Sequence, residues 1–239
     1  MINSYYSQYG EDKILSKIFE TTNGTCVEIG ANDGITYSNS LYFEKIGWQC
    51  VLVEPTPHLC ELIKKTRTAK LFECACSSDE GEAVFHYVRD HDLYSSIEEN
   101  CTMSTNIIIE NAEVIQTKVK TRTLDSILEE SGIKEIDFIT IDVEGHELSV
   151  LQGFNIKRWS PKIIIIEDNT DTMISDSSKL IISSGYTKFY RSGGNDWYTK
   201  DVWKTLRRGN WEVKGLLKSV LPVYIKKPLI NILRKYIYK

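Results

Sequence analysis

The chain has 239 residues, of which 41% are hydrophobic and 26% charged, with 14 glycines and 5 prolines. This composition excludes collagen-like, low-complexity and wholly disordered classes, and the length fits one enzyme-sized domain. The formal net charge of −4 argues against a nucleic-acid-binding domain. No stretch approaches the ~20 apolar residues of a membrane span, and the first residues do not resemble a secretory signal.

The charge is unevenly distributed. Residues 203–239 hold ten basic residues and one acidic residue, Glu212, which gives +9. Residues 1–202 hold the other 19 basic and 32 acidic residues, which gives −13. We therefore expect a domain over 1–202 and a separate basic tail over 203–239.

The cysteines predict a reducing compartment. There are six, with no Cys-x-x-Cys pair and no zinc-finger spacing: Cys26, Cys50, Cys60, Cys74, Cys76 and Cys101. Several lie in apolar runs, where a free thiol acts as a small hydrophobic side chain. We expect reduced cysteines and a cytoplasmic protein.

In the first half of the chain, short strands alternate with helical segments. Strands are expected over 25–29, 49–53 and 71–75, and helices over 38–46, which Gly47 ends, and 57–66. Residues 83–88 predict an extra strand or hairpin arm. Residues 89–118 are polar and without clear period, so a long insertion or loop over one face is expected.

The second half repeats the alternation. Thr123 should cap a helix that runs through Glu130 and ends at Gly132. Strands are expected over 137–141, 162–166, 186–190 and 196–199, and helices over 145–152 and 175–184. The pattern predicts a mostly parallel sheet with helices on both faces and right-handed crossovers. The last two strands should form an antiparallel hairpin at one edge.

The first chemical signal is the segment Val27-Glu28-Ile29-Gly30-Ala31-Asn32-Asp33-Gly34. Gly30 and Gly34 allow a tight turn after the first strand, where open α/β sheets bind ligands. The G-x-G-x-x-G pattern of dinucleotide sites is incomplete, and Asp33 would repel a diphosphate. Glu54 ends the second strand, where a carboxylate can accept hydrogen bonds from ribose. Together these acids favour a cationic, ribose-containing cofactor, S-adenosylmethionine.

The second signal is Asp142-Val143-Glu144-Gly145-His146-Glu147 after the fourth strand, with Glu167-Asp168-Asn169 after the fifth. Two chemistries fit. In one, His146 is a general base, because the reference pKa of histidine, about 6.5, suits proton removal near neutrality. In the other, oxygens of Asp142, Glu167, Asp168 or Asn169 hold Mg²⁺. Alternatively, Asp142 only orients the cofactor and Glu144 or His146 caps the next helix.

These segments resemble the FkbM family of class I methyltransferases, from Tyr6 to about Asn169. The matching motifs are SQYGED, VEIGANDG, Ser38-Asn39-Ser40, Gly47-Trp48, VEP, Thr123-Leu124-Asp125 and IDVEGHE. The resemblance implies a Rossmann-like fold with a seven-stranded sheet, and S-adenosylmethionine-dependent O-methylation of sugar hydroxyls in polysaccharides, glycans or glycosylated natural products.

The resemblance also implies site residues. Cofactor contacts are expected from the glycine turn and strand ends, with Gln8 and Asn39 at the methionine end: Gln8, Glu28, Gly30, Asn32, Gly34, Asn39, Glu54 and Asp142. His146 is the expected base, with Glu144 second. In related sugar methyltransferases, acids after the fourth and fifth strands hold Mg²⁺, and Asp142, Glu167 and Asp168 resemble that arrangement. Other readings are a nicotinamide oxidoreductase and a non-catalytic, cofactor-binding scaffold.

The tail carries its own prediction. From Pro228, apolar and aromatic residues fall on one face of a helix and basic residues on the other. Such a helix, within the basic segment 211–239, favours an anionic membrane surface, with docking on a partner enzyme or second subunit as the alternative. The protein would then be cytoplasmic and peripheral at the inner face of the membrane.

Overall fold

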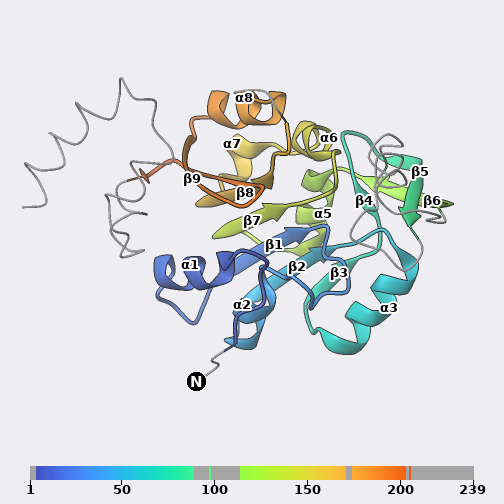
Figure 1. Cartoon of the computed structure of the whole chain (residues 1–239), viewed down its shortest axis with the longest axis horizontal. Helices are drawn as coiled ribbons and strands as arrows, with labels where there is room; N and C mark the ends of the chain where they lie inside the picture. Colours follow the sequence, from blue (N-terminus) through green and yellow to red (C-terminus); the bar gives the residue numbers. More distant parts are fainter. Residues whose placement is uncertain (1–3, 89–96, 98–113, 171–173, 203–204, 206–239) are drawn as a thin grey trace, which may run out of the picture.

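A seven-stranded sheet forms the centre of the computed structural model, which describes residues 4–88, 97, 114–170, 174–202 and 205. Its strand order is β3-β2-β1-β7-β8-β10-β9 (Figure 1). The strands are β1 (Thr25–Ile29), β2 (Gln49–Val53), β3 (Lys70–Phe72), β7 (Phe138–Ile141), β8 (Ile163–Glu167), β9 (Thr187–Ser192) and β10 (Asn195–Thr199). The first five pair in parallel, and β10 is antiparallel to both of its neighbours.

Helices cover both faces of this sheet. One face carries α1 (Glu11–Ile18), α2 (Leu41–Lys45) and α3 (Pro57–Thr66). The other carries α5 (Leu124–Ser131), α6 (Glu147–Gln152), α7 (Ile156–Trp159) and α8 (Asp176–Ser183).

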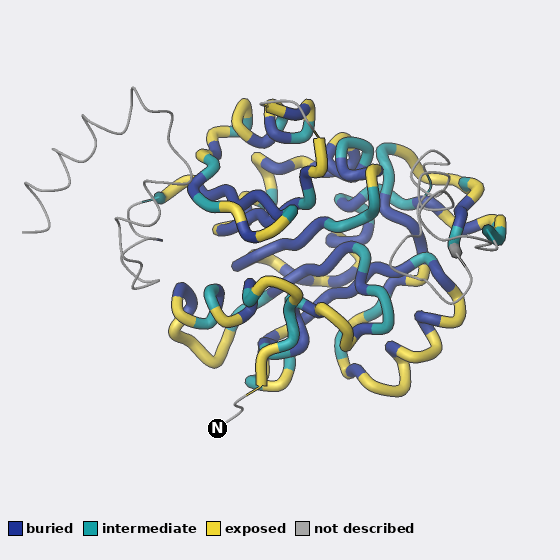
Figure 2. Tube along the Cα trace, viewed as in Figure 1, coloured by how far each residue is buried: buried dark blue, intermediate teal, exposed yellow. Residues whose placement is uncertain are grey.

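Alternation along each strand explains these two layers. In β1, Cys26 packs with the α1 face while Val27 packs with the α5 face. The strands are therefore buried on both sides, and the tube at the centre of Figure 2 is mostly in the dark blue of buried residues. The unbroken isoleucines of β8 fit this position, as the sequence predicted.

The predicted fold class is confirmed, and several element bounds agree with it. The strands at 25–29 and 49–53 and the helix at 57–66 have the predicted limits. Two helices begin later than predicted. Helix α2 starts at Leu41 because the preceding serine hydroxyls donate to Glu28, and α6 starts at Glu147 because residues 143–146 form a turn.

The predicted third strand at 71–75 was wrong in its second half. Strand β3 ends at Phe72, and the chain enters a second sheet at β4 (Ala75–Cys76). This sheet has the order β4-β6-β5, with β5 (Gly81–Val88) antiparallel to β6 (Val114–Arg122). Residues 114–118, predicted as part of a loop, therefore form half of a long strand. Most of the remaining predicted insertion lies outside the described residues.

The predicted antiparallel hairpin is present at one edge of the sheet: β9 is the edge strand, and β10 pairs with β8 inside the sheet. Helices α1 and α7 were not predicted. The tail over 203–239 lies outside the described residues except for Thr205, so its helix and the boundary at 202 stay predictions. Within the part of the chain that the structure describes, no helix has the length and hydropathy to span a bilayer.

Candidate active site

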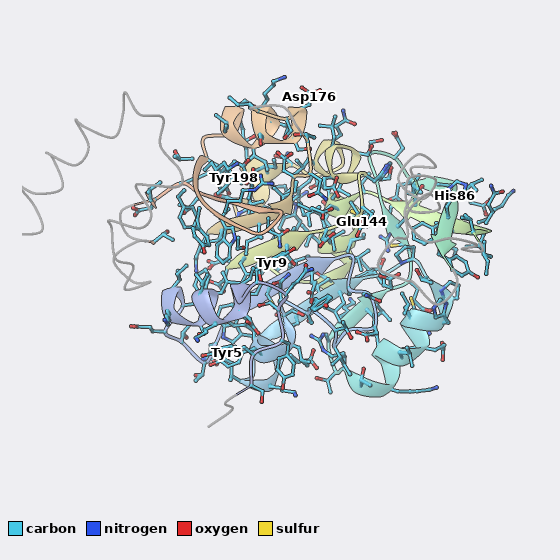
Figure 3. All side chains as sticks on the ribbon, in the orientation of Figure 1. Tyr5, Tyr9, His86, Glu144, Asp176 and Tyr198 are labelled. Atoms are coloured by element: carbon cyan, nitrogen blue, oxygen red, sulfur yellow. The ribbon has the colours of Figure 1, made fainter. Side chains whose placement is uncertain are left out.

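A cavity of about 320 Å³ opens at the carboxyl ends of β1, β2, β7 and β8. It is lined by side chains from the β1 turn, the strand ends, the second sheet and the N-terminal segment. Most of the predicted site residues are among them: Gln8, Glu28, Gly30, Asn32, Asn39, Glu54, Asp142, Glu144, His146 and Glu167. Tyr9 and Glu144, two of its lining residues, lie near the centre of the view in Figure 3.

The turn after β1 brings the backbone against β7. Gly30 has φ +84°, and a Cβ there would lie 1.8 Å from the carbonyl oxygen of Asp142. A side chain at this position would therefore clash with the Asp142 carbonyl, in addition to the strain of a positive φ. The amides of Gly30 and Ala31 both donate to the Val53 carbonyl, which fixes the turn against β2. The predicted tight turn is therefore present, and it forms one wall of the cavity.

Glu54 is held in place by backbone amides. Its Oε2 accepts from the Asn32 amide at 3.0 Å, and its Oε1 accepts from the Thr56 amide at 2.9 Å. The residue is buried at 4% exposure yet lines the cavity. A carboxylate oriented by two amides presents acceptor oxygens to hydroxyl donors in the cavity.

Glu28 organises the loop that precedes α2. Its carboxylate accepts hydrogen bonds from the Ser38 and Ser40 hydroxyls and from the Asn39 amide. The Arg67 guanidinium, just after the end of α3, supports the same loop by donating to the Ser40 hydroxyl at 2.8 Å. Glu28 thus acts on the cavity largely by positioning Asn39.

Two buried polar atoms of the cavity lack a partner. The side-chain oxygens of Asn39 and Thr140 make no hydrogen bond to any described residue. Buried polar atoms in folded proteins are nearly always paired, with protein, water or ligand. Their position in the cavity wall marks places where a bound molecule can donate hydrogen bonds.

A cluster of three carboxylates lies at one end of the cavity. Oxygens of Asp142, Glu144 and Glu167 lie within 4.8 Å of one another. Asp142 and Glu167 come from the ends of adjacent parallel strands, and Glu144 joins them through a left-handed backbone conformation, φ +53°. A non-glycine residue in that region is strained, which is frequent at functional sites.

Burial and mutual repulsion shift these acids toward the protonated form. Burial, then the charges of Glu167 and Asp142, raises the pKa of Glu144 to about 9. Burial and then the charge of Glu167 hold the pKa of Asp142 well above its usual range. Burial also raises the pKa of Glu167. The cluster can bind protons or a cation, because either relieves the repulsion.

The turn between β7 and α6 supports the cluster. Glu147 accepts from the amides of Val143 and Gly145 at 3.2 and 3.0 Å, which closes the turn that carries Glu144. Burial outweighs these bonds and raises the pKa of Glu147 to about 7. His146 is 9% exposed, precedes α6 and lies with its Nε2 3.1 Å from the Ser77 hydroxyl. It also lines the cavity.

Asp168 does not join the predicted metal ligands. Its carboxylate accepts from hydroxyls of Thr170, Ser175 and Ser178, at the start of α8. Burial acts to raise the pKa of Asp168, but these hydrogen bonds outweigh it and lower the pKa. Glu167 and Asp168 are successive residues at a strand end, so only one of them turns toward the cavity. Glu144 takes the place that the sequence assigned to Asp168.

Two residues of the glycine turn also lie outside the cavity lining. Asp33 accepts from the amides of Ile35 and Thr36, so it closes the turn locally. Gly34 donates to Ala31 and accepts from Arg67, which places it beneath the loop.

Other lining residues were not predicted as part of the site. Thr140 is the one polar residue of β7. Tyr9 and Tyr37 are each 46% exposed, and Cys74, Cys76 and Phe85 form an apolar wall. The motif SQYGED includes Tyr9, but within that motif only Gln8 was predicted as a site residue.

The sheet order and the cavity at its carboxyl edge agree with the Rossmann-like methyltransferase fold that the sequence predicted. The Methyltransferase FkbM domain model matches residues 28–196, most of the chain. The chain therefore belongs to the FkbM methyltransferase family and is an S-adenosylmethionine-dependent methyltransferase. A search of curated proteins found no match.

Similar solved structures have low identity. A precorrin-6y C5,15-methyltransferase from Geobacter metallireducens aligns with a TM-score of 0.44 and 12% identity, over 83% of this chain and 89% of that one. A TehB-like methyltransferase from Corynebacterium glutamicum gives 0.43 and 11%, over 81% and 89%. TrmK from M. capricolum, in complex with S-adenosyl-homocysteine, gives 0.38 and 11%, over 98% of each. The family assignment rests on the domain match.

Proposed function

We propose that the chain transfers the methyl group of S-adenosylmethionine to a hydroxyl oxygen of a sugar, in glycan, polysaccharide or glycosylated natural product biosynthesis. The observation that carries this proposal is the cluster of Asp142, Glu144 and Glu167 beside His146 in one cavity. Such a group can accept hydrogen bonds from several hydroxyls and remove a proton from one of them.

The polar atoms away from the acid cluster indicate where the donor, S-adenosylmethionine, would bind in the cavity. Glu54, held by two amides, would accept from ribose hydroxyls. The unpaired Asn39 oxygen would accept from the ammonium group, with Gln8 nearby in the wall. The acidic cluster suits a positively charged sulfonium, since a nearby cation favours ionised carboxylates. When bound, the donor supplies an electrophilic methyl group.

The protein's part in the reaction is orientation and proton removal. The acceptor oxygen bonds to the methyl carbon as the carbon–sulfur bond breaks, and that electron pair stays on sulfur. The hydroxyl proton passes to a base. His146 is our first assignment and Glu144 the second. Replacing each residue in turn distinguishes these two assignments. His146→Ala should lower turnover at saturating S-adenosylmethionine, and near-normal turnover would contradict His146 as the base.

The same cluster fits Mg²⁺, which prefers carboxylate oxygens. Asp142, Glu144 and Glu167 would hold the ion, which could bind vicinal hydroxyls and lower their pKa. A chelator separates the two mechanisms. Loss of transfer with a chelator, and recovery with added Mg²⁺, supports the metal; transfer unaffected by the chelator contradicts it.

An acceptor screen with labelled S-adenosylmethionine tests the function itself. The acceptors are nucleotide sugars, lipid-linked glycans and polysaccharide fragments, with matched phenols, amines and carboxylic acids as the comparison set. Label in an acid- and base-stable methyl ether of a sugar supports the proposal. Label confined to amines or carboxylic acids contradicts it, and transfer to any acceptor contradicts a purely non-catalytic scaffold.

A further inference from the structure

The N-terminal segment 6–10 forms part of the cavity wall and is attached on both sides. On one side, Ser7 forms a parallel bridge with Tyr37, in the loop between β1 and α2. On the other side, the ring of Tyr9 lies on Gly193, at the turn between β9 and β10. A Cβ on Gly193 would lie 2.3 Å from Cε2 and Cζ of Tyr9. Gln8 and Tyr9 both line the cavity. We call residues 6–10 the strap.

Glu11 fastens the strap to the hairpin. It is fully buried at 0% exposure. Its Oε1 accepts from the Ser192 hydroxyl at 2.8 Å and from the Asn195 side-chain amide at 3.1 Å. Its Oε2 accepts from the backbone amide of Tyr9 at 2.9 Å. One carboxylate therefore joins the strap backbone to both ends of the β9–β10 turn, and these charge-assisted bonds are strong when buried.

The turn beneath Tyr9 borders the acid cluster. Strand β10 begins beside the end of β8, where Asn195 pairs with Glu167. A Cβ on Gly194 would lie 3.0 Å from the Asn169 side-chain oxygen and 3.9 Å from Oε1 of Glu167. Tyr9 thus lies at the end of the cavity where proton removal is proposed, away from Glu54.

We propose that Tyr9 is an acceptor-binding residue and that Glu11 is the positioning residue that holds it there. The nature of the acceptor rests on the proposed function: a sugar ring presents an apolar C–H face, which stacks on an aromatic ring. Tyr9 has the needed geometry, with one face seated on Gly193 and 46% of the residue exposed. Its backbone is already ordered, so binding costs little conformational entropy.

Kinetic analysis of Tyr9→Ala tests the contact. The acceptor is the compound that takes label in the screen, whatever its class. We expect the acceptor KM to rise about 3- to 10-fold, as for loss of one aromatic contact. Binding of S-adenosyl-homocysteine, measured by calorimetry, should change less than about 2-fold, because the Tyr9 side chain makes none of the proposed donor contacts. Tyr9→Phe should recover most of the loss, since the ring makes the contact.

Tyr5 provides a matched control from the same segment. It is exposed to a similar extent, 43%, but its ring packs on Tyr42 and does not line the cavity. Figure 3 shows it well apart from Tyr9. Tyr5→Ala should leave the acceptor KM unchanged. An equal rise in both variants would overturn the contact and indicate a general loosening of the N-terminal segment.

Glu11→Gln tests the positioning role. Glutamine has one side-chain oxygen, so it cannot accept hydrogen bonds both from Tyr9 and from the hairpin residues. Its amide nitrogen would face a donor on one of these sides. The acceptor KM should rise as in Tyr9→Ala, and the double variant should show no further rise, because Glu11 acts through Tyr9. Additive effects would overturn the coupling. Gly193→Ala, which pushes the Tyr9 ring away, should also raise the acceptor KM.

Hydrogen exchange tests the fastening without any acceptor. In Glu11→Gln, the amides of residues 7–9 should exchange faster, while those of β1 stay protected. Unchanged exchange in the strap would overturn the role of Glu11. The two proposals fail separately: a non-sugar acceptor whose KM depends on Tyr9 contradicts the proposed function alone. A sugar acceptor whose KM is unaffected by Tyr9→Ala contradicts this inference alone.

Discussion

Glu144 couples the acid cluster to the stability of the protein. Its pKa is raised from 4.5 to about 9 by burial first and by neighbouring acids second. Between those values the folded state holds a proton that the unfolded state has released. The free energy of unfolding therefore falls as pH rises through this window. We expect Glu144→Gln to melt at a higher temperature than the wild type at pH 9, with a much smaller difference at pH 5.

A surface carboxylate is the control for this effect. Glu82 on β5 has a side chain 68% exposed, so Glu82→Gln removes the same charge without burial. Its melting temperature should follow that of the wild type at both pH values. The explanation fails if the wild type and Glu144→Gln show parallel melting curves across the range, because burial and the neighbouring acids would then not disfavour ionised Glu144 in the folded state.

Gly30 permits the close approach of the β1 turn to β7. In Gly30→Ala, the new methyl group would meet the Asp142 carbonyl at 1.8 Å, so one of the two backbones must move. We expect the free energy of unfolding to fall by more than about 3 kcal/mol, with loss of S-adenosyl-homocysteine binding. Gly132→Ala is the control: its φ is +80°, but nothing lies within 4 Å of the new Cβ. It should cost about 1–2 kcal/mol. Similar losses at both positions in chemical denaturation would show that only backbone strain matters.

At the residue scale, position along a strand predicts the site better than the direction of a side chain. Gly30, Glu54 and Asp142 follow parallel strands, whose carboxyl ends meet at one edge, so sequence places them together. Whether Glu167 or Asp168 joins the acid cluster depends on which of these two successive residues turns toward the cavity. The entry of Glu144 depends on a left-handed backbone conformation. Neither property is visible in the residue types.

At the scale of elements, Arg67 connects α3 to α2 and to the loop that carries Asn39. Its Nε donates to Glu44 at 2.8 Å with the Arg67 side chain 0% exposed, and its guanidinium also reaches Gly34 and Ser40. Arg67→Met leaves these acceptors buried without their donor. We expect a loss of about 3–5 kcal/mol in the free energy of unfolding.

An exposed ion pair of Lys64, on α3, gives the comparison. Lys64 contacts Glu61 and Glu73 at 2.8 Å, but its side chain is 42% exposed. Lys64→Met should cost less than about 1 kcal/mol. Urea denaturation of both variants measures the difference. Equal losses would mean that burial of the Arg67 network adds nothing to stability.

The hydrophobic pattern predicts helices and strands best where the element is buried along its whole length. The strands of the central sheet are apolar on both faces, and their limits follow from this. Strand β6 alternates Lys118 and Lys120 with residues that become buried only toward its end, so it resembled a polar loop. The division between β3 and β4 could not be predicted, because it depends on pairing with β6, far away in the chain.

At the scale of the whole molecule, the charges form two groups, one acidic and one basic. The acidic residues of 1–202 include the cavity acids, whose charges the sulfonium and a metal would offset. The basic residues of 203–239 lack such a partner in the sequence around them. A net charge of −4 hides this division. We therefore expect the tail to determine which large partner the enzyme meets.

An anionic membrane surface is the partner that we expect. Each basic residue near such a surface contributes about 1 kcal/mol, and the attraction is screened by salt. Replacing Lys226, Lys227, Arg234 and Lys235 by glutamine keeps the chain length and should weaken binding to phosphatidylserine vesicles at least ~100-fold. Co-sedimentation at low and high salt measures this, with phosphatidylcholine vesicles as the neutral control. Equal binding of the wild type and the variant would contradict the electrostatic anchor. No binding of the wild type to either vesicle would favour the alternative, docking of residues 211–239 on a partner enzyme, because a protein surface needs no anionic lipid.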